Sequence, residues 1–307
     1  MRHSAGVDST KVRRDEGSNG MCGSVAPGPA DPLIYIEQIR LLCCEYEIRT
    51  NSWDLITRLS GFTPHAEQDM PVVQRRTVII TWTGDEFQIS SDGIDDFELS
   101  QTGALETLFQ HLHRSAIAAM PDYIRLQAVT GNRAERSFLI AGPQRAGKST
   151  LALRLMLGGL DVTGDELVLL RNGMAIAFPR KFRVREDCLG LMPRSGPIDR
   201  IAASVGNPQE DRFVALDPQT FGKPWRIEPA AVSTIFYIEP NHGARSALRR
   251  SGKVEMARRL LPYCAPPKSG RRDWLGDLCA TIDRAETLVI ELGDLDSAVE
   301  LSIDALR

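Results

Sequence analysis

The chain has 307 residues, of which 42% are hydrophobic and 25% charged, with a net charge of -3. This composition is typical of a globular protein with room for one large domain or two modest ones. The small net charge argues against general attraction to nucleic acid, and the lack of an apolar run of about 18 residues argues against a membrane span. Because the first residues also lack the apolar segment of a secretory signal, we expect a cytoplasmic protein.

Residues 1–32 are rich in Gly, Ser, Pro and charge and contain almost no large apolar side chains. Such a segment buries too little surface to offset its ordering entropy, so a disordered tail is predicted. The pattern of residues 33–122 is mixed and predicts an α+β lobe. Its expected elements are a strand at 44–50, a short helix at 53–61, a hairpin at 77–90 that turns at Thr83-Gly84-Asp85, and a helix at 104–119.

Residues 123–307 alternate between strands and helices, which predicts an α/β domain. The expected strands are 124–131, 137–142, 166–170, 233–240 and 286–292, with an extended segment at 174–184, and the expected helices are 149–159, 253–263 and 294–306. Residues 190–230 have many Gly and Pro and little periodicity, and we interpret them as loops. The predicted fold class is therefore an α/β domain that follows an α+β lobe and a tail.

A glycine-rich motif lies between the second strand and the first helix of this α/β domain. The residues Gly142, Pro143, Gln144, Arg145, Ala146, Gly147, Lys148 and Ser149, followed by Thr150, fit the pattern G-x-x-x-x-G-K-[ST]. The glycines let the backbone fold so that N–H groups point at phosphate oxygens, and the following helix dipole favours an anion. In this pattern Lys148 reaches the β- and γ-phosphates, and the Ser149 hydroxyl ligates Mg²⁺.

The flanking sequence favours nucleotide binding at this loop. An apolar strand, FLIA, directly precedes it, and an apolar helix, LALRLML, directly follows it. The alternative is a Gly-rich strand-to-helix turn without a ligand, which gives no reason for Lys and Ser at these positions. We expect ATP and Mg²⁺ as ligands, although the loop reads phosphates rather than the base and leaves another phosphoryl donor open.

An acidic pair, Asp165-Glu166, follows the first helix. One interpretation is an exposed turn that caps the strand ELVLL, because the sequence GLDVTGDE is only weakly apolar before Asp165. The other is that both carboxylates lie beside the nucleotide, one holding Mg²⁺ and the other accepting a hydroxyl proton from a phosphate acceptor.

The unit GPQRAGKSTLALRLMLGGLDVTGDELVLL, the segment FPRKFRVRE and the late strands STIFYIEP and ETLVIEL together resemble the HPr kinase/phosphorylase group and its relatives. The resemblance is strongest over residues 137–185, weaker over 45–136 and 230–307, and absent from the tail. It implies a phosphate-loop fold related to phosphoenolpyruvate carboxykinase. It also implies that Lys148 and Ser149 bind phosphate and Mg²⁺, and that Asp165 is the catalytic carboxylate.

The chain departs from that family's pattern at three places. Glu166 stands where the family usually has a second aspartate, and the extra methylene changes the reach toward Mg²⁺. Gln127 stands at the position of a family histidine, and an amide neither takes up a proton nor carries charge. Gln144-Arg145 replaces small residues, and Arg145 is expected either to neutralise phosphate charge or to face solvent.

Basic residues crowd into FPRKFRVRE, namely Arg180, Lys181, Arg183 and Arg185. In a half-buried strand, alternation puts Lys181, Arg183 and Arg185 on one face. That face is either an anion-binding edge for nucleotide phosphate or an acidic peptide, or a solvated surface.

Three functions remain open from the sequence. The first is a kinase that moves the γ-phosphate of ATP to a serine hydroxyl of a protein or peptide acceptor. The family resemblance includes peptide natural-product precursors among the acceptors, and it also includes assembly into homo-oligomers. The second is a nucleotide-dependent regulatory or partner-binding module with little transfer, which Gln127 favours. The third is a transporter-type ATPase, which ranks last because the chain has no LSGGQ-like signature.

Overall fold

The computed structural model describes residues 33–307, apart from 34, 92–93, 101–103, 134–135, 195 and 206–211. The tail predicted over residues 1–32 lies outside the described residues. Packing divides the chain into two compact units: one comprises the described residues up to Thr63 together with Pro71–Ala119, and the other Pro64–Met70 together with Met120–Arg307. The short segment Pro64–Met70 thus belongs with the second unit, although the predicted division after residue 122 assigns it to the first lobe.

The first unit is a five-stranded sheet packed against two helices. The strand order is β1-β2-β4-β5-β6, where β1 is Tyr35–Leu41, β2 Cys44–Thr50, β4 Gln74–Trp82, β5 Glu86–Ser91 and β6 Ile94–Ser100. Helices α1 (Trp53–Phe62) and α2 (Ala104–Ala118) contact the sheet and each other. The expected hairpin is the antiparallel pair β4–β5, and the expected strand and two helices are β2, α1 and α2, so the four elements predicted here are confirmed. Strands β1 and β6 were not predicted.

The second unit is built on a large mixed sheet. Its strands are β7 (Ile124–Leu126), β8 (Ala128–Arg133), β9 (Arg136–Ala141), β10 (Asp161–Gly164), β11 (Val168–Arg171), β12 (Met174–Ala177), β16 (Ala230–Pro240), β17 (Ala247–Arg250), β18 (Cys264–Ala265) and β19 (Glu286–Leu292). Strand β16 pairs in parallel with both β9 and β19. The carboxyl ends of these three strands therefore meet at one edge of the sheet, where open α/β sheets bind ligands.

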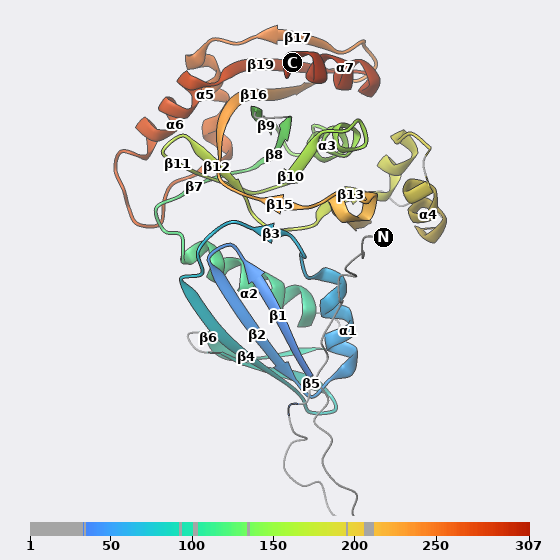
Figure 1. The fold of residues 1–307 in the computed structure, drawn as a ribbon, viewed down its shortest axis with the longest axis vertical. Helices are drawn as coiled ribbons and strands as arrows, with labels where there is room; N and C mark the ends of the chain where they lie inside the picture. The colour runs from blue at the N-terminus through green and yellow to red at the C-terminus, as the bar shows by residue number, and fades with distance from the viewer. Residues whose placement is uncertain are drawn as a thin grey trace, which may run out of the picture. The chain divides into compact units, whose positions relative to one another are not determined.

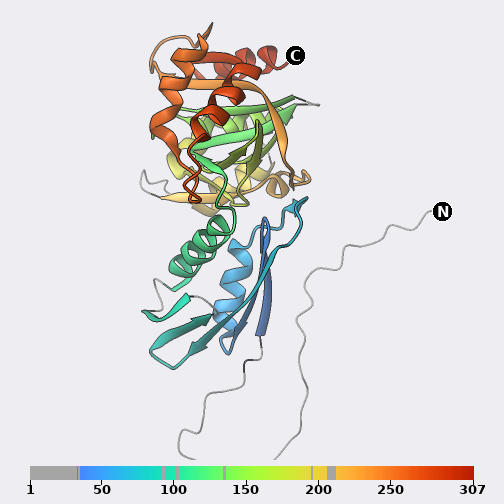
Figure 2. The ribbon, with the colours of Figure 1, turned by 90° about the vertical axis from the view of Figure 1, so that its left-hand side faces the viewer.

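Helices cover both faces of this part of the sheet, as Figure 1 shows. On one face lie α3 (Lys148–Leu157) and α7 (Leu295–Ala305), and on the other α5 (Lys253–Leu260) and α6 (Trp274–Arg284). Successive side chains of β9 point to opposite faces of the sheet, and both faces are buried. Phe138 and Ile140 join the core on the α3 side, and Leu139 and Ala141 join the core on the α5 side. A strand buried on both faces needs apolar residues at every position. Figure 2 gives the view at right angles.

Two predictions for the second unit are wrong. The strand predicted over 124–131 is two strands, β7 and β8, separated at Gln127, whose backbone N–H donates to the carbonyl of Tyr263. The region 190–230 is not all loops, because its described part contains short elements that lack a long periodic pattern. They are the end of the 3-10 helix η1 (Glu186–Leu191), α4 (Gly196–Val205), β14 (Phe213–Leu216), the 3-10 helix η2 (Pro218–Phe221) and β15 (Arg226–Ile227), which pairs with β3 (Glu67–Gln68).

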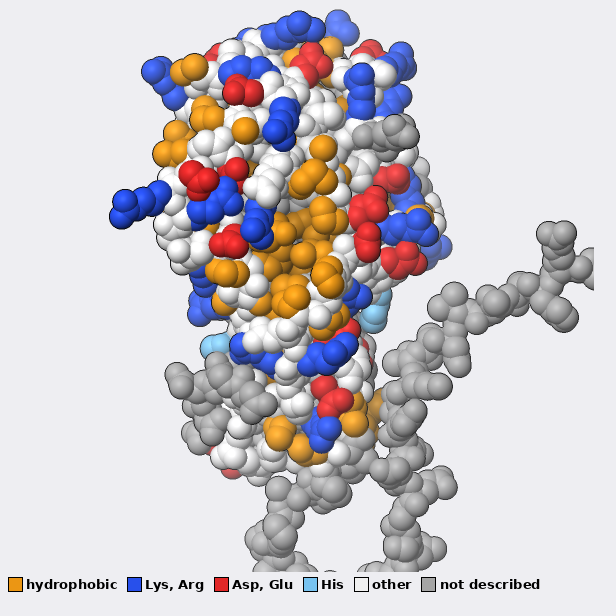
Figure 3. Space-filling model, turned by 60° about the vertical axis from the view of Figure 1, so that its left-hand side comes forward, with side chains coloured by type: hydrophobic (Ala, Val, Ile, Leu, Met, Phe, Trp, Pro, Cys, Tyr) orange, Lys and Arg blue, Asp and Glu red, His pale blue; other side chains and the backbone are white. Residues whose placement is uncertain are grey.

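The expected strand 286–292, now β19, and the final helix, now α7, are confirmed, and Asp294 caps α7 by accepting a hydrogen bond from the Ser297 N–H. Some large apolar side chains stay exposed in this unit, including Met174 and Leu261, and Figure 3 shows hydrophobic side chains gathered on one face of it. Among the described helices, none combines the length and apolarity needed to cross a membrane.

Candidate phosphate-binding site

The glycine-rich loop connects β9 to α3, at the strand-to-helix position that its sequence predicts. Gly147 has φ 93°, and a Cβ added there would lie 2.7 Å from Cδ2 of Leu292. Gly142 has φ 152°, and its added Cβ would lie 3.0 Å from the carbonyl oxygen of Ile238. Both positions therefore need glycine for conformation and for close packing. The N-terminus of α3 opens directly from this loop, with Gly147 as its N-cap.

The side chain of Lys148 folds back over the loop. Its Nζ atom donates to the carbonyl oxygens of Gly142 at 2.9 Å and of Pro143 at 2.7 Å. Burial lowers the pKa of Lys148, while the nearby carboxylates of Asp165 and Glu166 act in the opposite direction. A buried ammonium group with only carbonyl partners is well prepared for phosphate oxygens, which are stronger acceptors.

The carboxylate of Asp165 lies against the start of α3. The short strand β10 ends at Gly164, whose added Cβ would lie 2.5 Å from Cβ of Ala177, so this close approach fixes where the next residue emerges. Asp165 is 6% exposed, and its carboxylate accepts a hydrogen bond from the Glu166 N–H at 2.8 Å. Burial raises the pKa of Asp165, and the neighbouring Ser149 side chain and Glu166 N–H oppose the rise. The interpretation of Asp165 as an exposed turn residue is therefore wrong.

Glu166 lies at the same edge in an unusual backbone conformation. Its φ is 73°, in the left-handed region that non-glycine residues rarely adopt. Its Oε2 atom is 2.6 Å from Nη1 of Arg180. The Glu166 carboxylate thus borders the site but is already engaged by an arginine.

The four basic residues of FPRKFRVRE separate into different environments. Strand β13 is Phe182–Arg185, and its alternate residues Phe182 and Val184 enter the core, which leaves Arg183 and Arg185 on the outer face. The Arg183 guanidinium carbon lies 4.7 Å from the centre of the Phe213 ring, and Arg185 Nε donates to Asp187 at 2.9 Å. Arg180 pairs with Glu166, and Lys181 lies 3.6 Å from Asp217. Neither of these two basic residues lines the cavity described below.

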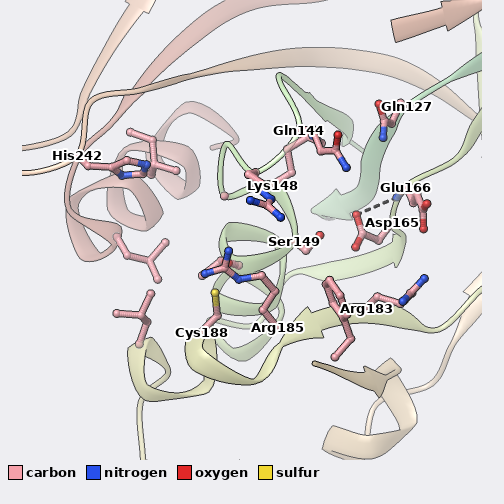
Figure 4. Close-up of a pocket in the computed structure, with 18 residues that line it drawn as sticks. Gln127, Gln144, Lys148, Ser149, Asp165, Glu166, Arg183, Arg185, Cys188 and His242 are labelled. Atoms are coloured by element: carbon pink, nitrogen blue, oxygen red, sulfur yellow. Dashed lines mark hydrogen bonds between the residues drawn. The ribbon is translucent and has the colours of Figure 1, made fainter. Parts of the chain in front are cut away.

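These side chains surround a cavity of about 630 Å³, drawn in Figure 4. Its lining includes the sequence-predicted residues Gln127, Gln144, Arg145, Gly147, Lys148, Ser149, Thr150, Asp165, Glu166, Arg183 and Arg185. Gly142, Pro143 and Ala146 belong to the loop but not to the lining. The structure thus brings the loop, the acidic pair and the substituted position Gln127 together in one place.

Part of the lining was not predicted. These residues are Cys188, Leu191, Phe213, His242, Leu292, Gly293 and Leu295. Burial raises the pKa of Cys188, and the nearby Thr150 at the start of α3 opposes the rise. For His242, Leu292, Gly293 and Leu295 the only sequence signal is that they end or follow the apolar strands β16 and β19. The parallel pairing with β9 brings the carboxyl ends of these strands to the loop, and the sequence alone does not give that pairing.

The site suits a magnesium ion that is bound mainly by phosphate and water. In the described part of the chain, no group of three or more His, Cys, Asp or Glu side chains is arranged to hold a metal. Mg²⁺ at nucleotide sites takes only one or two protein oxygens beside phosphates and waters. The Ser149 hydroxyl and the Asp165 carboxylate, which line the same cavity, supply such oxygens.

Comparisons with known proteins show a distant likeness to solved structures. No protein-family model matches the chain, and no curated protein matches it. Among solved structures, it is similar to the Hpr(Ser) kinase/phosphatase from Coxiella burnetii, at 14% sequence identity and a TM-score of 0.30. The match covers 59% of this chain and 92% of that one. At this TM-score the likeness defines neither the fold nor the activity, so function has to be argued from the side chains.

Proposed function

We propose that the chain is an ATP- and Mg²⁺-dependent kinase that transfers the γ-phosphoryl group to a serine hydroxyl of a protein or peptide. One observation carries the proposal: a buried carboxylate, Asp165, lines the same cavity as Lys148 and Ser149, at the N-terminus of the helix that the phosphate loop opens. Phosphoryl transfer depends mostly on positioning and on neutralising charge. The site offers both, together with a base.

The residues would divide the work as follows. The loop N–H groups and the dipole of α3 hold the phosphate chain, and Lys148 exchanges its carbonyl partners for phosphate oxygens. Mg²⁺, when bound through Ser149 and Asp165, neutralises part of the phosphate charge. As the acceptor oxygen forms its bond to the γ-phosphorus, the bond from that phosphorus to the β,γ-bridging oxygen breaks. Asp165 accepts the hydroxyl proton, and ADP leaves.

The environment of Asp165 favours this role. Burial raises its pKa, which brings it closer to the working pH and makes it a stronger base than an exposed aspartate. The acceptor class, a serine-containing protein or peptide, comes from the family resemblance of the sequence and not from a feature of the cavity.

A second candidate is a nucleotide-binding regulatory module with little transfer. Gln127 lines the same cavity as Asp165, so a neutral amide borders the site where a histidine would add a titratable group. This candidate keeps every phosphate contact and drops only the acceptor chemistry.

Label transfer separates the two. Wild type, Lys148→Ala and Asp165→Asn are incubated with γ-labelled ATP, Mg²⁺ and a host-cell extract. An acid-stable labelled band that requires both Lys148 and Asp165 supports the kinase and identifies its acceptor. Saturable Mg-ATP binding by wild type, lost in Lys148→Ala and without any labelled band, supports the regulatory module instead.

A further inference from the structure

The cavity has two chemically different ends. Figure 4 shows Asp165, Glu166 and Gln127 on one side of Lys148 and Ser149, and His242 on the other. In a phosphate loop the terminal phosphate lies where the metal and the acidic residue are, and the lysine reaches the β- and γ-phosphates. If the proposed function holds, the γ-phosphoryl group therefore lies toward Asp165, and the rest of the donor extends toward His242.

The His242 end is formed by two loops that follow parallel strands. Strand β16 ends at Pro240 and β19 ends at Leu292, and the Asn241 N–H donates to the Leu292 carbonyl at 2.8 Å. His242 follows Asn241 directly and lines the cavity together with Leu292, Gly293 and Leu295.

Further hydrogen bonds tie these two loops together. The Gly293 N–H donates to Oγ of Ser246 at 2.9 Å, and the Ser246 N–H donates to Oδ2 of Asp294 at 2.9 Å. The Ser246 hydroxyl also donates to the Asp294 carbonyl at 2.6 Å. This end is consequently preformed, and a ligand does not have to order it.

The side chains at this end suit an aromatic ring and not a phosphate. Leu292 and Leu295 are apolar, Gly293 adds no side chain, and His242 contributes an exposed imidazole. Among the described residues of these two loops that line the cavity, none is Lys, Arg, Asp or Glu. A flat heterocycle gains contact area from apolar walls and an imidazole face, whereas a second phosphate group gains nothing there.

We infer that the base of the nucleoside triphosphate lies against His242, Leu292 and Leu295, so that this end of the cavity distinguishes the nucleotide from a bare pyrophosphate or polyphosphate. This inference rests on the proposed function, because it uses the loop as the phosphate site. It assigns a specificity role to a residue outside the loop motif.

Calorimetric titration of the full chain with Mg-ATP and with Mg-tripolyphosphate tests the assignment. The variants are His242→Ala, His242→Phe, which keeps a flat ring, and His65→Ala as a matched control, because His65 is an exposed histidine outside the cavity. Wild type is expected to bind Mg-ATP about 10-fold more tightly than Mg-tripolyphosphate. His242→Ala should weaken Mg-ATP about 5- to 10-fold and leave Mg-tripolyphosphate unchanged. His242→Phe should restore most of the loss, and His65→Ala should change neither affinity.

Equal affinity of wild type for the two ligands would overturn the inference and leave the phosphate site intact. So would a loss in His242→Ala that is the same for both ligands, or a loss that His242→Phe does not restore. If wild type binds neither ligand, the proposed function itself fails, and the inference fails with it.

Discussion

The Nζ atom of Lys148 lies 2.7 Å from the carbonyl oxygen of Pro143, within the same loop that its charge is expected to serve. The bond satisfies a buried ammonium group, and a bound phosphate oxygen would replace the carbonyl as its partner. This relationship makes Lys148 the residue whose loss should affect binding most.

Lys148→Met is expected to weaken Mg-ATP binding about 100-fold or more, because charge-assisted hydrogen bonds to phosphate disappear. Calorimetry measures the affinity, and circular dichroism checks the fold. Lys253→Met is a matched control, since Lys253 also donates to two backbone carbonyls, those of Ile282 and Ala285, but lies outside the cavity. Unchanged affinity in Lys148→Met would rule out the loop as the phosphate site.

Asp165→Asn is expected to lower the transfer rate about 10²- to 10⁴-fold, the usual contribution of a general base. The amide keeps the shape, and its carbonyl oxygen can still accept from the Glu166 N–H and ligate Mg²⁺, so Mg-ATP should continue to bind. Asp161→Asn is the control, because Asp161 is an exposed residue of the same strand, β10. If Asp165→Asn loses nucleotide binding as well as transfer, the loss of transfer follows from the lost binding and no longer supports Asp165 as the proton acceptor.

The raised pKa of Asp165 also predicts how stability depends on pH. The folded protein retains the Asp165 proton above the ordinary pKa of 3.8, at pH values where the unfolded chain has lost it. Stability therefore falls as the pH rises from 3.8 through the folded-state pKa, because the buried carboxylate must then carry charge. Asp165→Asn lacks this penalty, so its unfolding free energy relative to wild type should increase across that window and then stay constant.

Urea denaturation of both proteins without nucleotide, at a series of pH values from 4 upward, measures this difference. Asp161→Asn provides the baseline for removing an exposed carboxylate. A difference that is flat with pH, or that shrinks as the pH rises, would contradict a raised pKa at Asp165.

The sequence allowed the loop to be located because its signal is local. A G-x-x-x-x-G-K-S motif between an apolar strand and an apolar helix leaves few other structures for Lys148 and Ser149. The burial of Asp165 was harder to predict, because β10 is short and only Val162 and Gly164 in it are buried. A strand of that length gives too few alternations to distinguish a buried carboxylate from a turn.

The opposite wall of the cavity could not be predicted, because it depends on long-range pairing. His242 and Leu295 are far from the loop in sequence, and only the parallel pairing of β9, β16 and β19 brings them to it. Phe213 lies in β14, a short strand within a region rich in Gly and Pro, and only its pairing with β13 places it beside Arg183. Local periodicity carries no information about such pairings.

Arg183→Gln tests whether the outer face of β13 binds anions. No carboxylate among the described residues forms an ion pair with Arg183, and its guanidinium rests on the Phe213 ring, so its charge is available to a ligand in the cavity. We expect Mg-ATP affinity to fall about 3- to 10-fold. Arg194→Gln is the control, since Arg194 is an exposed arginine outside the cavity. Equal affinities for both variants and wild type would favour a solvated face.

Gly293→Ala tests whether the two loops at the His242 end must pack closely. A Cβ at residue 293 would collide with the backbone carbonyl of Ala244, which no side-chain rotation relieves. The substitution is expected to destabilise the protein by about 1–3 kcal/mol and to weaken Mg-ATP binding, because the loop that carries His242 has to move. Gly252→Ala is the matched control, because nothing lies within 4 Å of its added Cβ and its φ of -69° suits alanine. Urea unfolding and calorimetry measure the two effects, and a Gly293→Ala variant as stable as Gly252→Ala would show that the close packing of these loops is dispensable.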